Sequence, residues 1–144
     1  MTAAALGINA ANQSHTYNSE KSDLVAKARG VLDRIARDVR RAHSVTVPID
    51  NDHSITITIR TKLDDSTTWT YETRTYAWSG IASGAIALTV VTDDGTTSAV
   101  LTDDVQTFTV DDADQPTYSI HLVLAGGKAT TEASITATPR KEFF

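Results

Sequence analysis

The stretch LVAKARGVLDRIARDVRRAHSV, residues 24–45, decides the fold. Its apolar residues recur every three or four positions, the spacing that lines one face of an α-helix. The residues expected to pack this helix against a sheet are Leu24, Ala28, Val31, Leu32, Ile35 and Val39. The pattern predicts a helix over residues 22–43, with Ser19 or Ser22 as its N-cap.

The charged residues of this helix are assigned to its solvent-facing side. Asp38 precedes Arg41 by three positions, the spacing of a surface ion pair on a helix. The last turns carry a cluster of candidate partner-contact residues, Arg34, Arg37, Arg40 and Arg41. Three interpretations stay open for the cluster: a solvated face that suits the helix dipole, a contact patch for a protein partner, and a patch for an anionic lipid surface.

After Val45 the apolar period changes to two, which predicts β-strands up to residue 139. The isoleucines of SITITIRT, residues 54–61, share one face. Asp94-Gly95 stands between two strand patterns, which is a strong signal for a hairpin.

Two further segments complete the strand pattern. The aromatic residues of TWTYETRTYAW, residues 68–78, change phase, which predicts a bulge or a break near Thr73–Thr75. In VQTFTV, residues 105–110, the alternation predicts a separate strand that starts after an acidic turn. The loops are too short for crossover helices, so the sheet should be antiparallel. The expected fold class is α+β, with one N-terminal amphipathic helix packed on an antiparallel β-sheet.

Length and charge narrow the organisation and the partners. The chain of 144 residues suits a single globular head over residues 21–144, preceded by a polar, alanine-rich lead-in over residues 1–20. Residues 1–43 carry seven Lys/Arg and four Asp/Glu, whereas the rest carries six and fourteen, for a net charge of −5. Because only the helix is basic, nucleic acid is not expected as a partner. The chain has no cysteine, which excludes disulfides and cysteine-based metal sites.

No motif in the sequence assembles a catalytic or metal site. Acidic pairs occur at Asp64-Asp65, Asp93-Asp94, Asp103-Asp104 and Asp111-Asp112. They are interpreted as turn residues, although Asp112 and Asp114 leave calcium binding as a side hypothesis. The histidines lack metal-ligand spacing; they are His15, His43, His53 and His121. GxSxG, GxGxxG and Walker A motifs are all absent, so neither an enzyme nor a cofactor is expected.

Four segments carry a family resemblance: ARGVLDRIARDVRRAHSVTV (28–47), YAWSGIASGAIAL (76–88), LTDDVQTFTVDDAD (101–114) and ITATPRKEFF (135–144). In this order they resemble type IV pilin-like proteins, most of all the J-type minor pseudopilins of type II secretion. The resemblance covers roughly residues 20–141. Prepilins of that family also carry a basic leader, a peptidase site and a hydrophobic helix of about 20 residues. The resemblance implies that TAAALGINAAN, residues 2–12, is the end of such a helix.

The resemblance implies a non-enzymatic structural subunit, the soluble head of a minor pilin or pseudopilin that takes part in assembling a pilus-like fibre for secretion or surface attachment. Its partners would be other pilin-like subunits. The full-length protein would be anchored in the inner membrane, with its head on the periplasmic side or the cell surface, and the truncated head would be monomeric. The alternative is an extracytoplasmic ligand-binding or adhesin-like β module that uses Trp69, Tyr71, Tyr76 and Trp78 as an aromatic surface.

Overall fold

One helix and seven strands make up the fold. The computed structural model describes the backbone of residues 3–62 and 69–140 and the side chains of residues 15–61 and 69–140. The elements are α1 (Ala3–Arg41), β1 (Ser44–Thr46), β2 (Ser54–Lys62), β3 (Trp69–Trp78), β4 (Gly84–Thr92), β5 (Gly95–Asp111), β6 (Tyr118–Gly126) and β7 (Ala129–Ala137). Each strand pairs antiparallel with the next, so the sheet is a meander in the order β1-β2-β3-β4-β5-β6-β7.

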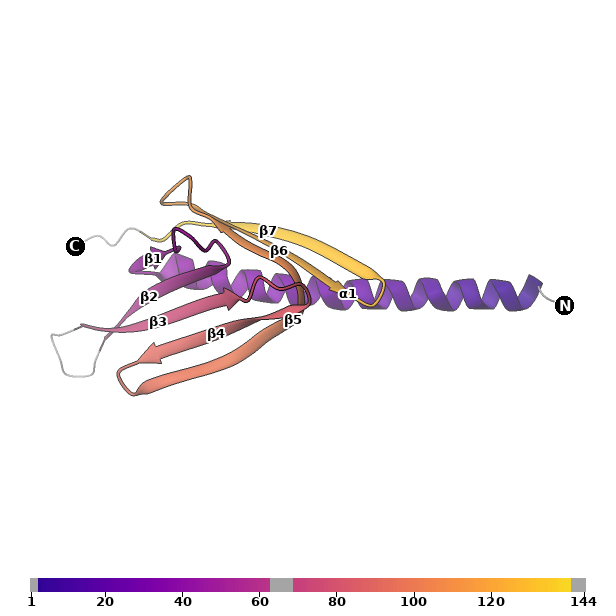
Figure 1. Ribbon diagram of the computed structural model, residues 1–144, viewed down its shortest axis with the longest axis horizontal. Helices are drawn as coiled ribbons and strands as arrows, with labels where there is room; N and C mark the ends of the chain where they lie inside the picture. Colours follow the sequence, from indigo (N-terminus) through magenta and orange to yellow (C-terminus); the bar gives the residue numbers. More distant parts are fainter. Residues whose placement is uncertain (1–2, 63–68, 141–144) are drawn as a thin grey trace.

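The sheet curls around the C-terminal half of α1 (Figure 1). The helix lies mainly on β7 and β6, with smaller contacts to β2 and β5. The predicted α+β fold, one N-terminal helix on an antiparallel sheet, is therefore confirmed.

The core lies between the helix and the concave face of the sheet. The six helix residues chosen from the apolar spacing are each at most 6% exposed. Ile55, Ile57 and Ile59 of β2 and Phe108 of β5 meet them from the sheet, each at most 4% exposed. Because burying one such side chain contributes about 1.5–3 kcal/mol, this contact surface is enough to hold the helix in place.

Helix α1 begins far earlier than the sequence pattern predicted. Ser19 and Ser22 lie inside it and cap nothing, so the predicted start at residue 22 is wrong. Figure 1 shows the helix continuing past the β6–β7 turn, where the Lys128 backbone N–H donates to the Glu20 carboxylate at 3.3 Å. At 1.5 Å per residue, the part before Glu20 extends about 25 Å beyond that turn.

Strand β3 is regular where a bulge was predicted. Its pairing with β2 runs without interruption from Ser54 opposite Ala77 to Lys62 opposite Trp69, so the bulge near Thr73–Thr75 is wrong. The aromatic residues at odd and even positions of β3 simply occupy opposite faces of the sheet. The register shifts lie elsewhere, at the start of β4 and between Val105 and Thr107 of β5.

Strand β5 is a single bent element of 17 residues instead of two strands. Asp103-Asp104, predicted as a turn, lies inside it, and Asp104 has a φ of 59°. Aspartate tolerates this left-handed conformation, so the chain bends at a bulge without ending the strand.

The other acidic pairs of the described chain stand at turns. The hairpin predicted at Asp94-Gly95 is confirmed, because Thr92 pairs with Gly95 across a two-residue loop. The Asp111 carboxylate accepts a hydrogen bond at 2.8 Å from the backbone N–H of Ala113. Asp64-Asp65 lies outside the described residues.

Candidate functional site

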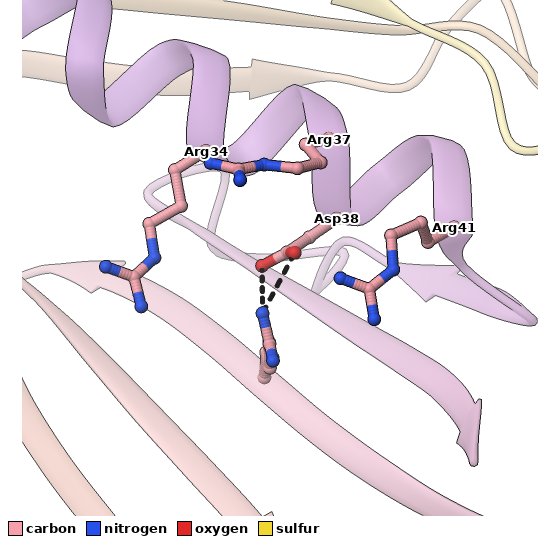
Figure 2. Close-up of a pocket in the computed structure, with 5 residues that line it drawn as sticks. Arg34, Arg37, Asp38 and Arg41 are labelled. Atoms are coloured by element: carbon pink, nitrogen blue, oxygen red, sulfur yellow. Dashed lines mark hydrogen bonds and ion pairs between the residues drawn. The ribbon is translucent and has the colours of Figure 1, made fainter. Parts of the chain in front are cut away.

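A basic pocket of about 260 Å³ lies between the last turns of α1 and β3. Its lining residues are Arg34, Arg37, Asp38, Arg41 and Arg74. The four helix positions follow the i, i+3, i+4, i+7 spacing, so the helix itself places them on one side. Figure 2 shows the side chains of Arg34 and Arg41 extending from the helix toward the sheet, with the Asp38 carboxylate between them.

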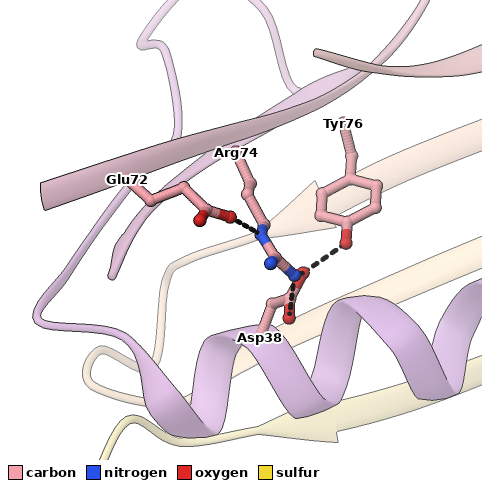
Figure 3. A network of polar contacts seen from close by, with 4 residues as sticks. All are labelled: Asp38, Glu72, Arg74 and Tyr76. Carbon is pink, nitrogen blue, oxygen red and sulfur yellow. Dashed lines mark hydrogen bonds and ion pairs between the residues drawn. The ribbon is translucent and has the colours of Figure 1, made fainter. Parts of the chain in front are cut away.

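Hydrogen bonds from β3 hold the Asp38 carboxylate in place in this pocket. Its side chain is buried and lies 3.0 Å and 3.1 Å, through its two oxygens, from Nη1 of Arg74. The Tyr76 hydroxyl donates a hydrogen bond to the same carboxylate, and Arg74 Nε donates to Glu72 (Figure 3). The prediction that Asp38 faces solvent beside Arg41 is therefore wrong, because its carboxylate binds inward-facing side chains of β3 instead.

The network changes the acid–base properties of its members. Burial raises the pKa of Tyr76 well above its usual range, and the Asp38 carboxylate raises it further. Burial alone would lower the pKa of Arg74, but its hydrogen bonds to Glu72 and Asp38 outweigh that effect and raise it. Arg74 and Tyr76 therefore keep their protons across the ordinary pH range.

Positively charged side chains outnumber negatively charged ones around the pocket. The guanidinium groups of four arginines surround Asp38, and Glu72 is the second carboxylate of the network. Within the described residues, no carboxylate forms an ion pair with Arg37 or Arg41. Since arginine presents a planar set of donors that matches carboxylates and phosphates, the pocket can bind an anionic group.

The predicted arginine cluster is only partly brought together. Arg34, Arg37 and Arg41 line the pocket, whereas Arg40 lies outside it, although all four residues are exposed. The backbone carbonyl of Arg40 accepts a hydrogen bond at 3.2 Å from the backbone N–H of Arg140.

Sequence reasoning missed Arg74 and Glu72. The alternation of side chains along β3 could have found them. Positions 72 and 74 lie on the same face of the strand as Tyr76 and Trp78, which are 0% and 8% exposed. A charged residue at an even-numbered position of β3 therefore faces the helix side of the sheet, where it needs a partner of opposite charge.

The aromatic surface of the alternative function does not assemble. Tyr76 and Trp78 are core residues, whereas Trp69 and Tyr71 are 46% and 43% exposed on the opposite face. The Arg60 guanidinium lies 5.0 Å from the centre of the Trp69 ring, a cation–π contact. Of the four aromatic residues in the proposed surface, only Trp69 and Tyr71 are available to a ligand.

The described residues form neither a metal site nor a membrane-spanning helix. Among these residues, no three histidine or acidic side chains converge as metal ligands. Asp112 instead accepts a hydrogen bond from the Gln115 side-chain amide at 3.1 Å. The described part of α1, though long, holds no apolar stretch that could cross a bilayer.

Comparison of the chain with protein-family models, with curated proteins and with solved structures finds no match.

Proposed function

We propose that this chain is the head of a pilin-like structural subunit, of the minor pilin or pseudopilin kind, which takes part in assembling a pilus-like fibre. The observation that carries the proposal is the division of α1 into two parts. Its C-terminal half is enclosed by the curled sheet, and its N-terminal part leaves the head unpaired with any strand (Figure 1).

A projecting helix of this kind needs a partner. Isolated helices of about 12–15 residues are marginal in water, because packing and not intrinsic propensity supplies most helix stability. Residues 15–19 of the projecting part are exposed to solvent in the single chain. In this proposal the projecting part packs against other pilin-like subunits, and a separate apolar helix anchors the protein in the inner membrane with the head outside the cytoplasm. The proposed role is structural and involves no catalysis.

The proposal is tested on the native gene and protein. We expect the reading frame to continue upstream of Met1 through a basic leader and about 20 apolar residues. We also expect the native protein to remain with the inner membrane after salt and alkaline washes. A native protein that is released by these washes and lacks such a segment would exclude the pilin-like function.

The alternative function, a ligand-binding β module, is distinguished by Trp69. This side chain is half exposed beside Tyr71, so a ligand on that face would change its fluorescence. We expect no saturable change on titration with glycans, and a saturable change that Tyr71→Ala weakens would favour the alternative.

A further inference from the structure

Strand β5 has a long free edge. It pairs with β4 along Gly95–Val105, but β6 pairs with it only along Val105–Asp111. The second edge of residues 95–104 therefore has no strand partner among the described residues. In Figure 1 the β4–β5 hairpin projects at the margin of the sheet, with the first half of β5 outermost.

This edge lacks the features that normally block strand addition. Natural edge strands carry lysine, proline or a bulge, because unpaired backbone N–H and C=O groups recruit other strands. The segment GTTSAV, residues 95–100, contains no charge, no proline and no bulge; the strand is bulged only beyond it, at Leu101 and near Asp104. Residues 95–100 are all exposed, and Val100 is 67% exposed.

A basic groove lies directly beside the edge. A second hollow, of about 250 Å³, is lined by Lys27, Gly30, Val31, Arg34 and Leu101. Leu101 belongs to the free edge, and Arg34 also lines the basic pocket around Asp38. At Gly30 no atom lies within 4 Å of the position that a Cβ would occupy, so the helix leaves the groove open there. Lys27 forms an ion pair with Asp103 of β5 at 3.8 Å, so Arg34 is the residue that continues positive charge from this groove into the arginine pocket.

We propose that the free edge of β5 and this groove together bind an extended acidic segment of a protein partner by strand addition. The backbone of the segment pairs with residues 96–100, and alternate side chains of an added strand point to one face. The inward-facing carboxylate nearest Leu101 then meets Arg34, and the arginine pocket extends the positive surface beyond it. This binding goes beyond the pilin-like function and does not depend on it.

The test uses the whole chain and synthetic peptides of eight residues. The probe is a capped Thr-Glu repeat, and the controls are a Thr-Lys repeat and an N-methylated Thr-Glu repeat that cannot donate backbone hydrogen bonds. We expect only the unmodified acidic peptide to bind, and we expect it to slow hydrogen exchange of the amides at 96–100 that exchange rapidly in the free chain. Equal binding of the N-methylated peptide, or of the Thr-Lys peptide, would refute strand addition by an acidic segment, as would no binding at all.

A pair of charge-matched variants separates the groove from general charge attraction. Arg34→Gln should weaken acidic-peptide binding about tenfold, the effect of losing one charge-assisted hydrogen bond. Arg29→Gln removes the same charge from an exposed position outside both hollows and should leave binding unchanged. Equal losses in the two variants would overturn the proposal. So would a peptide-sensitive self-association in sedimentation equilibrium, because the occupant would then be a second copy of the chain.

Discussion

Asp38 of helix α1 and Arg74 of strand β3 form an ion pair in which one guanidinium nitrogen lies within 3.1 Å of both carboxylate oxygens. The carboxylate is almost fully buried, and the Arg74 side chain is 22% exposed. The pair joins the end of the helix to the third strand, beside the arginine pocket.

Asp38→Asn should be strongly destabilising. The variant leaves the Arg74 guanidinium facing a neutral amide at a buried position, which costs about 3 kcal/mol or more in the free energy of unfolding. Asp33→Asn removes the same charge from an exposed site of the same helix and should stay within about 0.5 kcal/mol of the wild type. Urea denaturation of both variants measures the difference, and similar values would mean that the pair contributes little.

The stability of the protein should fall at high pH because of Tyr76. The folded state raises the pKa of this hydroxyl, whereas the unfolded chain titrates near pH 10. The stabilisation is therefore complete below about pH 10 and is lost above it, by about 1.4 kcal/mol per pH unit. Urea denaturation between about pH 9 and pH 11 should show a shallower decline for Tyr76→Phe than for the wild type. Identical slopes would refute the assignment.

Ile35→Ala tests the contact between helix and sheet. Ile35 is 0% exposed in the core, and its truncation should cost about 2–5 kcal/mol through lost burial and a residual cavity. Ile81→Ala is the matched control, because this isoleucine is 70% exposed and its truncation should cost less than about 0.5 kcal/mol. Thermal and urea unfolding compare the two, and equal losses would contradict the packing.

Gly30→Ala should stabilise the protein. The glycine lies in mid-helix, is exposed and has open space where a Cβ would stand, so alanine should add about 0.5–1 kcal/mol. Ala26→Gly, at an exposed position one turn earlier, should lower stability by a similar amount. A loss of stability in Gly30→Ala would show that the groove does not tolerate even a methyl group.

The sequence was sufficient for the architecture. The spacing from Leu24 to Val39 predicted the helix and its buried face, and the period-two segments predicted an antiparallel sheet. Both patterns depend on which residues leave water, and that preference can be read locally. The hairpin predicted at Asp94-Gly95 was also readable locally, because two-residue loops have local sequence requirements, although its loop is Asp93-Asp94, one residue earlier.

The candidate site was only half predictable. Three of its arginines could be chosen from the helix, but the partner of Asp38 stands 36 residues away on β3. A buried aspartate cannot be distinguished from an exposed one until the strand that supplies its counter-charge is placed. The continuous course of β5 was missed for a similar reason, since a bulge at Asp104 and a turn at Asp103-Asp104 have similar local sequences.

The arrangement of α1 against β7 has a consequence for biosynthesis. The first element of the chain packs mainly on the last described strand, and about 90 residues separate Arg41 from Ala129. At 5–20 residues per second, the ribosome needs on the order of ten seconds to make that interval. Throughout this time the apolar stripe of the helix lacks its main cover, so the nascent chain presents it to chaperones and to neighbouring nascent chains. This exposure lasts until β7 has been made, even though every strand pairing in the sheet is between neighbours in the sequence.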